Sequence, residues 1–298
     1  MIAVAKHIEA KVSLKAKLVD YHQLVKTRLT FSVVLSAVFG FLLAPAYSTD
    51  WNALLAVFAG GFLVVAAANG INQVIEKNFD KLMIRTHNRP VATGRMTVYE
   101  ALIFCFVAGS VGIFVLARFL NPMSGWLGFI ALASYAFVYT PLKRVTPFAV
   151  LVGAIPGAIP PMLGWVASTG EIQAGAIILF TIQFFWQFPH FWSIAWILDE
   201  DYRRAGYTLL PSRNGKDKKS AFFTIWYTFI LIPLALLPFV LGISGWISMV
   251  VAVIAGVVML LQAIRLYQSC LENDAKRLMF LSIIYNPLVL LAFLLDKI

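Results

Sequence analysis

Residues 53–72 read ALLAVFAGGFLVVAAANGIN, a run that contains no charged side chain. An α-helix rises about 1.5 Å per residue, so a run of about 20 apolar residues is long enough to cross the hydrocarbon core of a bilayer. Similar runs recur along the whole chain, and together they predict nine transmembrane helices. The runs lie at about 30–47, 53–72, 99–117, 125–140, 148–168, 173–197, 221–243, 246–264 and 278–295.

The composition agrees with a membrane protein. Of the 298 residues, 60% are hydrophobic and 13% are charged, whereas a soluble globular domain has roughly 25% charged residues. This composition excludes a disordered chain, a secreted disulfide scaffold and a collagen-like fibre. The two cysteines, Cys105 and Cys270, lie in or near apolar runs, and we expect both to serve packing. We therefore predict an all-α polytopic membrane protein.

The basic residues predict the orientation of the chain. All of the 24 lysines and arginines except Arg118 and Lys297 lie before the first run or in loops on the same side of the membrane as that segment. By the positive-inside rule this side is cytoplasmic, so the N-terminus is inside and the C-terminus outside. We expect a multi-pass protein of the bacterial inner (plasma) membrane. A mitochondrial presequence is disfavoured, because residues 1–28 contain acidic residues and no arginine before Arg28.

The domain organisation follows from the lengths of the polar segments. Residues 1–28 have no apolar core of a signal peptide, and we expect a cytoplasmic amphipathic segment that lies along the membrane surface. The later loops are short, so residues 29–298 are expected to form a single transmembrane domain. Within it, the run at 148–168 contains Pro156, Pro160 and Pro161, which predict a kink or local unwinding.

A first group of polar residues stands where the second predicted helix reaches the cytoplasm. Asn72, Glu76 and Asp80 are spaced four apart and share one helix face. An amide and two carboxylates suit Mg²⁺, which takes further ligands from water and substrate phosphates. Arg85 and Arg89 follow, and guanidinium groups bind phosphate oxygens well. The group predicts a diphosphate site, although a solvated helix end paired with neighbouring lysines explains the same pattern.

A second group follows the sixth predicted helix. Its acidic triplet, Asp199 to Asp201, predicts a second metal ligand set or a solvated helix end. His190 lies inside the preceding apolar segment, and an ionisable residue within a span is a candidate functional residue. Three roles are open for it: a ligand of haem iron, a general base, or a hydrogen-bonded structural residue. The basic pair Lys143 and Arg144 fits an ordinary cytoplasmic loop, and nothing predicts nucleic-acid binding.

Four stretches resemble the UbiA-type intramembrane prenyltransferases, and within them the branch that modifies haem. They are LVKTRLTFSVVLSAVFGFLLAP at 24–45, NQVIEKNFDKLMIRTHNRPVATGRM at 72–96, YTPLKRVTPFAVLVGAIPGAIPPMLGW at 139–165, and WQFPHFW with DEDYRRAGYTLLP within 186–211. Residues 221–298 resemble the family only in hydropathy and number of spans. Glu76 replaces the aspartate that is usual at the middle position of the family's first motif, and the second aspartate-rich motif is only partly present, which favours haem over a quinone precursor as acceptor.

The resemblance implies nine helices around a central cavity, with a cytoplasmic cap over the diphosphate site, and a prenyltransferase domain over residues 29–298. It implies transfer of a farnesyl group from farnesyl diphosphate to a vinyl group of haem b, with addition of water. The implied catalytic residues are Asn72, Glu76, Asp80 and Asp201. The implied ligands of Mg²⁺ are Asn72, Glu76, Asp80, Asp199 and Asp201. The implied diphosphate-binding residues are Lys26, Arg28, Arg85, Arg89, Lys143 and Arg144, and His190 is the candidate contact to haem.

Three other functions remain open at this point. A prenyltransferase of the same fold can act on a quinone precursor or a lipid. A transporter can use a kinked span as its substrate path, although the charges here gather at one face. A non-catalytic assembly partner of a respiratory oxidase would not need Glu76 or Asp80. The expected partners are farnesyl diphosphate, haem b, the lipid bilayer and haem-oxidase assembly proteins, with no nucleic acid.

Overall fold

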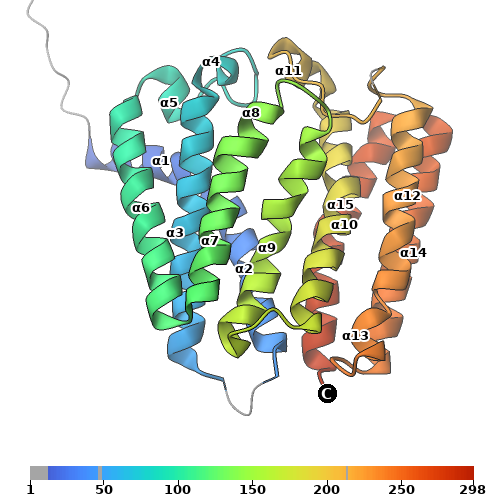
Figure 1. Ribbon diagram of the computed structural model, residues 1–298. Coiled ribbons are helices and arrows are strands. Elements are labelled where there is room, and N and C mark those ends of the chain that lie inside the picture. The colour runs from blue at the N-terminus through green and yellow to red at the C-terminus, as the bar shows by residue number, and fades with distance from the viewer. Residues whose placement is uncertain (1–12, 46–48, 213) are drawn as a thin grey trace, which may run out of the picture.

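The computed structural model describes residues 13–45, 49–212 and 214–298. Within these ranges every named element of secondary structure is a helix (Figure 1). This confirms the predicted all-α class. The first twelve residues of the predicted N-terminal segment lie outside the described residues. The helices are α1 (Leu14–Val25), α2 (Thr27–Leu43), α3 (Trp51–Ile75), α4 (Lys77–Asp80), α5 (Pro90–Thr93), α6 (Val98–Phe119), α7 (Pro122–Ala133), the π-helix η1 (Ser134–Tyr139), α8 (Thr140–Leu142), α9 (Ala149–Thr169), α10 (Ala174–Ile197), α11 (Asp199–Arg204), α12 (Lys218–Leu234), α13 (Leu237–Val240), α14 (Trp246–Ser269) and α15 (Glu272–Leu295).

Seven helical segments are long and apolar enough to cross a membrane. They are α3, α6, α7 to α8, α9, α12 to α13, α14 and α15. α1 and α2 are bent by 48° relative to each other at Lys26. If this bent pair is counted as one span, the described residues contain eight candidate membrane spans. α10, with 24 residues, is as long as these spans but is not one of the seven, because Gln183, Gln187 and His190 lower its hydropathy. The amide of Gln187 donates to the carbonyl of Ala154 at 3.0 Å, so α9 satisfies this polar group inside the protein.

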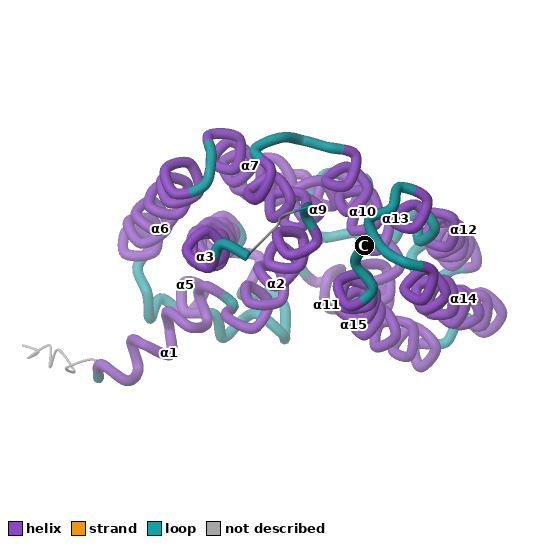
Figure 2. The backbone as a smooth tube through the Cα atoms, turned by 90° about the horizontal axis from the view of Figure 1, so that it is seen from below, coloured by secondary structure: helices purple, strands orange, loops and turns teal. Residues whose placement is uncertain are grey.

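The long helices form a closed ring when they are viewed along their axes (Figure 2). In chain order, α2 packs against α3, α3 against α6, and each following long helix against the next, as far as α14 and α15. α15 then packs against α2 and closes the ring. Among the further contacts, those of α2 with α9 and of α10 with α15 are the most extensive, and they cross its interior. The first and last thirds of the chain therefore meet, although they are distant in sequence.

α9 is the most buried of the candidate spans, with 67% of its apolar window inside the protein. It runs as one continuous helix despite its three internal prolines, so the predicted local unwinding is absent. Glycines allow its close approach to α2. A Cβ atom at Gly164 would lie 1.8 Å from the carbonyl oxygen of Ala37, and one at Gly40 would lie 2.0 Å from that of Pro161. Only glycine fits at these two positions.

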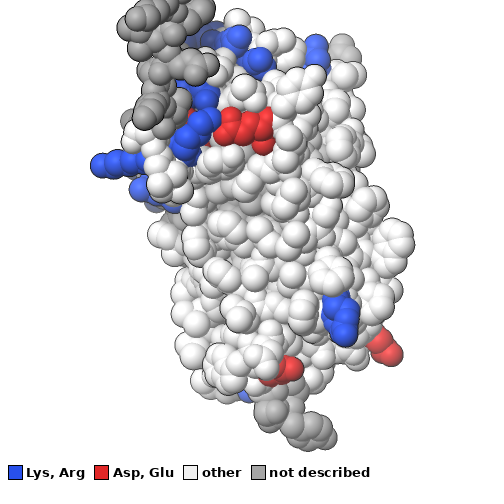
Figure 3. All heavy atoms as spheres, turned by 90° about the vertical axis from the view of Figure 1, so that its left-hand side faces the viewer, with Lys and Arg blue, Asp and Glu red and all other residues white. Residues whose placement is uncertain are grey.

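Charge is concentrated at one end of the ring. Figure 3 shows a broad band without charged residues, above which most of the visible charge gathers, at the end that carries α4, α5 and α11 in Figure 1. Large apolar side chains such as Phe106, Phe114 and Trp126 are exposed, as expected for residues that face lipid. The one-sided charge agrees with the basic pattern of the sequence.

The C-terminal residues join three helices at the opposite end. The ammonium of Lys297 donates to the carbonyl oxygens of Leu42 at 2.8 Å and Ala44 at 2.6 Å, where α2 ends. The carboxylate of Asp296 accepts from the backbone N–H of Ser248 at 2.7 Å, in the first turn of α14. Helix ends have unsatisfied backbone groups, so both contacts supply partners that the helices lack.

Candidate functional site

The acidic residues of the first group are buried where α3 passes into α4. Glu76 is the residue between the two helices, Asn72 lies in the last turn of α3, and Asp80 ends α4. Their exposed fractions are 2% for Asn72, 4% for Glu76 and 0% for Asp80. Neither Lys77 nor Lys81 pairs with them among the described residues. A solvated helix end is therefore the wrong interpretation of this group.

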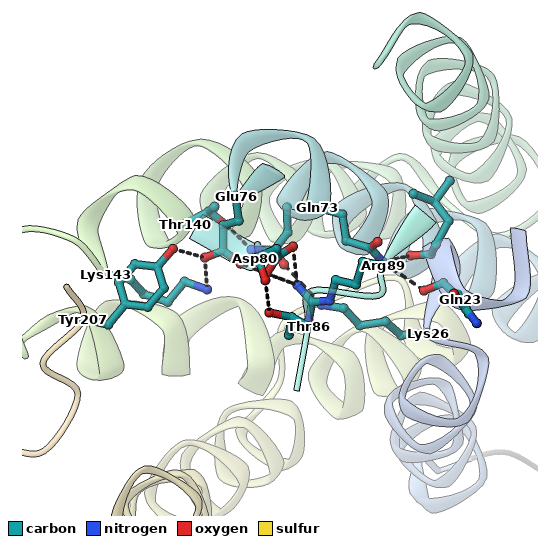
Figure 4. A network of polar contacts seen from close by, with 12 residues as sticks. Gln23, Lys26, Gln73, Glu76, Asp80, Thr86, Arg89, Thr140, Lys143 and Tyr207 are labelled. Carbon is teal, nitrogen blue, oxygen red and sulfur yellow. Dashed lines mark hydrogen bonds and ion pairs between the residues drawn. The ribbon is translucent and has the colours of Figure 1, made fainter. Parts of the chain in front are cut away.

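Basic side chains from two other segments face the two carboxylates (Figure 4). The ammonium of Lys143, which follows α8, lies 2.5 Å from Oε1 of Glu76. One guanidinium nitrogen of Arg89, which precedes α5, donates to both carboxylate oxygens of Asp80 at 2.8 Å and lies 4.0 Å from Glu76. Buried charges are tolerated when they are paired in this way. The structure thus brings together four of the residues that the sequence predicts.

A further predicted residue, Lys26, reaches the same cluster from the break between α1 and α2, where it contacts Asn72. Its backbone is left-handed, with φ of 49°, and its ammonium donates to Oδ1 of Asn72 at 3.2 Å. The amide nitrogen of Asn72 donates to the hydroxyl of Thr140 at 3.1 Å. That hydroxyl in turn donates to the carbonyl of Tyr135 at 2.9 Å, across the π-helix η1. The amide of Asn72 is therefore fixed, with its oxygen toward the lysine.

The electrostatics of the cluster follow from burial and from the alternating charges. Burial raises the pKa of Asp80, and the charge of Arg89 opposes this rise only in part. Burial alone would also raise the pKa of Glu76, but the positive charges of Lys143, Lys26 and Arg89 together hold it below its usual value. Burial lowers the pKa of Lys26 well below its usual range, and Arg89 lowers it further. The cluster therefore favours the ionised form of Glu76 and disfavours that of Asp80, each relative to its ordinary pKa.

The position of Lys26 depends on Gln73, a residue that the sequence interpretation missed. Gln73 is completely buried, and its amide donates to the carbonyl oxygens of Gln23 at 2.9 Å and Leu24 at 2.8 Å. These are the last carbonyls of α1, which lack partners within the helix. A glutamine beside Asn72 near the end of an apolar run was the only available signal in the sequence.

Tyr207 is a second residue that the sequence interpretation missed. Its hydroxyl donates to Oε1 of Glu76 at 3.4 Å, and its ring lies 5.9 Å from that of Phe79. It follows Gly206, whose φ of 76° is readily adopted only by glycine, at the turn after α11. Burial raises the pKa of Tyr207, so the hydroxyl remains a donor. Because of this turn, Tyr207, which follows the acidic triplet of α11, contacts Glu76 of the first acidic group.

The other three predicted diphosphate residues lie at the rim of the cluster. The guanidinium of Arg144 stacks on the ring of Phe79 at 4.1 Å, and that of Arg85 lies 5.9 Å from the ring of Tyr202. Arg28 is exposed in the first turn of α2. None of the three joins the described ion pairs with Glu76 or Asp80.

The second acidic group makes different contacts. The carboxylate of Asp201 accepts from the backbone N–H groups of Ile84 at 2.6 Å and Arg85 at 3.2 Å. It therefore holds the loop that leads to Arg89. Asp199 pairs with Arg203 at 2.9 Å. Across the described ranges, no three His, Cys, Asp or Glu side chains gather as a protein-only metal site requires, so Asp199 and Asp201 are not brought to Asn72, Glu76 and Asp80.

The donors at the first group fit Mg²⁺ in company with a diphosphate. Asn72, Glu76 and Asp80 offer only oxygen ligands, the type that Mg²⁺ prefers. Three side chains do not complete its octahedral shell, so phosphate oxygens and water have to supply the remainder. Lys26, Arg89 and Lys143 supply the positive charge that a bound diphosphate needs.

His190 lies on α10, away from this cluster in the sequence and facing α15. Its Nδ1 is 2.9 Å from the hydroxyl of Ser282, and its ring stacks on that of Trp186, with centroids 4.9 Å apart and an interplanar angle of 13°. The indole N–H of Trp186 donates to the carbonyl of Ser282 at 2.8 Å. One ring nitrogen of the half-buried histidine is thus hydrogen-bonded inside the protein.

The helical fold, and the cluster of acidic and basic side chains around Glu76 and Asp80 at one end of the long helices, define an intramembrane prenyltransferase. The chain matches the model of the UbiA prenyltransferase family over residues 33–284, and it belongs to that family. Among similar proteins, the protoheme IX farnesyltransferase of Cytophaga hutchinsonii is 45% identical over 278 residues, which cover 93% of this chain and 97% of that protein. The protoheme IX farnesyltransferase of Flavobacterium johnsoniae is 46% identical over 293 residues, or 96% and 97% of the two chains.

Solved structures share the fold at low sequence identity. Digeranylgeranylglyceryl phosphate synthase aligns with a TM-score of 0.79 at 21% identity, covering 94% of this chain and 98% of its own. A UbiA homolog from Archaeoglobus fulgidus, bound to GPP and Mg²⁺, aligns with a TM-score of 0.71 at 14% identity, covering 92% and 99%. The order of helices around the ring is therefore that of the UbiA fold.

Proposed function

We propose that this protein transfers a farnesyl group from farnesyl diphosphate to a vinyl group of haem b, with addition of water, and forms haem O and diphosphate. The observation that carries the proposal is the buried cluster of Asn72, Glu76 and Asp80, faced by three basic side chains, at the end of membrane-spanning helices. The family supports prenyl transfer, and relatives above 40% identity over nearly the whole chain support haem as the acceptor.

The reaction begins with cleavage of the allylic C–O bond of farnesyl diphosphate. Negative charge develops on the leaving diphosphate, and the half-buried cations Arg89 and Lys143 stabilise it in this low-dielectric setting. The amine of Lys26 lies in the same cluster, and a bound anion favours its protonated form. Mg²⁺ held by Asn72, Glu76 and Asp80 supplies further Lewis-acid stabilisation of the diphosphate oxygens when it is bound. The rim residues Arg28, Arg85 and Arg144 attract the anion at longer range, as expected for a charged mouth.

The farnesyl cation then forms a carbon–carbon bond with the haem vinyl group. Water adds to the carbocation left on the haem side and loses a proton, which gives the hydroxyethylfarnesyl substituent. His190 is the residue that we propose for contact to haem, because it is the ionisable side chain of a long and mostly apolar helix, α10.

We propose a positioning role for Asp201 in place of the metal-ligand role that the sequence suggests. Its two hydrogen bonds to backbone N–H groups fix the loop that carries Arg85 and leads to Arg89. Asp199 supports the same helix, α11, through Arg203. The metal ligands that we propose are therefore Asn72, Glu76 and Asp80 alone.

We also propose nine transmembrane spans around a central cavity that opens to lipid, with a cap of α4, α5 and α11 in the cytoplasm. In this arrangement α2 and α10 are the eighth and ninth spans, the N-terminus is cytoplasmic and the C-terminus is outside the bacterial inner membrane. α1 lies on the membrane surface, where its exposed Leu14, Leu18 and Val19 contact lipid. A C-terminal alkaline phosphatase fusion tests the orientation, and activity of the fusion requires an external C-terminus. Haem-oxidase assembly proteins are the proposed recipients of the product.

The decisive experiment is the product mass after purified protein in detergent is incubated with haem b, farnesyl diphosphate and Mg²⁺. The expected product is haem heavier by one farnesyl group and one hydroxyl group, because the added water loses a proton. Asp80→Asn should lose the product because it removes a buried carboxylate of the cluster. Glu272→Gln is the matched control, because Glu272 is an exposed carboxylate, paired with Lys276, in the first turn of α15.

Two outcomes would contradict the proposal. Unmodified haem with folded protein would reject haem as the acceptor, and 4-hydroxybenzoate added to the same mixture would then test an aromatic acceptor. Equal activity of Asp80→Asn and wild type would reject the assigned diphosphate site.

A further inference from the structure

Ser282 of α15 lies between a histidine ring and a backbone carbonyl. The side chain is completely buried, and its hydroxyl oxygen is 2.6 Å from the carbonyl oxygen of Met279 and 2.9 Å from Nδ1 of His190. A carbonyl oxygen only accepts hydrogen bonds. The single hydroxyl proton of Ser282 is therefore donated to Met279, and the hydroxyl oxygen is left to accept from His190.

The opposite arrangement is unfavourable. If the hydroxyl proton pointed to Nδ1 of His190, the oxygens of Ser282 and Met279 would face each other at 2.6 Å with no proton between them. Two lone pairs at that separation repel each other, and the repulsion is strong in a buried, low-dielectric position. The 2.6 Å contact thus requires a proton on Nδ1 of His190.

The neighbouring indole holds the ring in place. Trp186 stacks on His190 with an interplanar angle of 13°, and its own N–H is bonded to the carbonyl of Ser282 at 2.8 Å. Both oxygens of Ser282 therefore bond to this pair of rings: the hydroxyl oxygen to the imidazole of His190 and the carbonyl oxygen to the indole of Trp186. The plane of the imidazole and its hydrogen-bonded edge are fixed together.

We propose that Ser282 is a positioning residue that keeps His190 in the tautomer protonated at Nδ1, so that Nε2 retains its lone pair and is the electron-pair donor toward haem. In metal sites, a ligating imidazole commonly donates its other N–H to a fixed acceptor, which sets the tautomer and the ring orientation. The part that concerns haem rests on the proposed function. The tautomer itself does not, because it follows from the contacts of Ser282 within the protein.

The tautomer is measured by nitrogen NMR on the full-length protein labelled with ¹⁵N-histidine, at a pH where the imidazole is neutral and without haem. The chain has only 4 histidines, and the signals of His190 are identified by their loss in His190→Gln. We expect a protonated Nδ1 and an unprotonated Nε2 in the wild type. Ser282→Ala should shift the population toward a protonated Nε2, and Ser282→Thr, which keeps the hydroxyl, should restore the wild-type spectrum.

Ser36→Ala is the matched control, because Ser36 is a buried serine on α2 that also donates to the carbonyl three residues earlier at 2.6 Å. It should leave the signals of His190 unchanged. A wild-type His190 protonated at Nε2, or a spectrum that Ser282→Ala does not alter, would overturn the proposal.

The functional arm is an optical titration of the same variants with haem b. Loss of an outer partner of a metal-binding imidazole lowers affinity by about 10–100-fold, so Ser282→Ala should weaken haem binding by about tenfold or more, and Ser282→Thr and Ser36→Ala should not. Unchanged affinity of Ser282→Ala would overturn the positioning role. A wild type with the expected tautomer but no haem binding would instead refute haem as the acceptor, and the tautomer assignment would stand.

Discussion

Replacing Arg89 by methionine tests whether the buried ion pair with Asp80 is structural as well as catalytic. One nitrogen of Arg89 contacts both oxygens of a carboxylate that is 0% exposed. Removing one partner of a buried ion pair costs about 3–5 kcal/mol, because the other charge is left without compensation. At about 2–4 °C per kcal/mol, the scale for chains of about 150–250 residues, Arg89→Met should lower the melting temperature by about 6–20 °C near pH 8.

The loss should depend on pH in a direction that follows from the pKa of Asp80. Burial raises the pKa of Asp80 in the folded protein above its value in the unfolded chain. The resulting contribution to the free energy of folding is complete at a pH below the unfolded-state pKa, where the carboxyl is protonated in both states, and it is lost as the pH rises through the folded-state pKa. Without Arg89 the pKa of Asp80 rises further. The deficit of Arg89→Met should therefore be complete at high pH and shrink, by at most about 1.4 kcal/mol per pH unit, as the pH falls below the new pKa.

Thermal unfolding in detergent can be followed with a thiol-reactive dye, because Cys105 is buried and becomes accessible on unfolding. Melting curves of wild type and Arg89→Met are compared from pH 8 to pH 5. Arg277→Met is the matched control: Arg277 is largely exposed and 3.7 Å from Asp274, and an exposed pair contributes only about 0–1 kcal/mol.

Two results would refute this reasoning. One is a deficit of Arg89→Met that does not change with pH, which would indicate lost packing rather than an uncompensated carboxylate. The other is failure of Asp80→Asn to recover stability when it is combined with Arg89→Met, since the double variant leaves no charge unpaired. Arg89→Lys should keep most of the stability but lose activity, because it retains one charged donor and lacks the remaining guanidinium N–H groups.

Three further predictions concern other parts of the molecule. Glu76→Gln should lower kcat at least about a hundredfold, because it removes a proposed carboxylate ligand of the Mg²⁺ that stabilises the leaving diphosphate, and equal turnover would reject its assignment. Tyr207→Phe should change kcat less than about fivefold and stability by less than about 1 kcal/mol, since its 3.4 Å hydrogen bond is long; a hundredfold loss would show a direct role of the hydroxyl. Lys297→Met should lower stability by about 1.5–3 kcal/mol by releasing the last carbonyls of α2, with KM unchanged, and a raised KM would connect this end to the active site.

Much of the site could be predicted because its spacing is local. Asn72, Glu76 and Asp80 are one helical turn apart, so any helix through them aligns their side chains, and the structure places them together. The sequence could not show which basic residues contact this acidic group, because those residues come from other segments of the chain. Of six basic residues near the predicted mouth, Lys26, Arg89 and Lys143 enter the cluster, while Arg28, Arg85 and Arg144 remain at its rim.

The reason lies in the turns between helices. Lys26 points to Asn72 because the chain bends at a left-handed residue, and Tyr207 reaches Glu76 because Gly206 permits a tight turn. Such geometry depends on a single backbone angle that no periodic pattern reports. Asp201 illustrates the same limit, because an acidic residue at a helix end can bind a cation or a backbone amide, and only the nearby loop decides which.

The sequence by itself therefore determined the membrane class, the helical fold, the sided distribution of charge and the acidic face of the site, because hydropathy, charge and helical period are local properties. The tertiary structure decided which cations oppose which acids and which nitrogen of His190 is engaged by Ser282, a residue 92 positions away. Those choices depend on the closure of the ring between distant helices. They express long-range packing and the requirement that buried polar groups find partners.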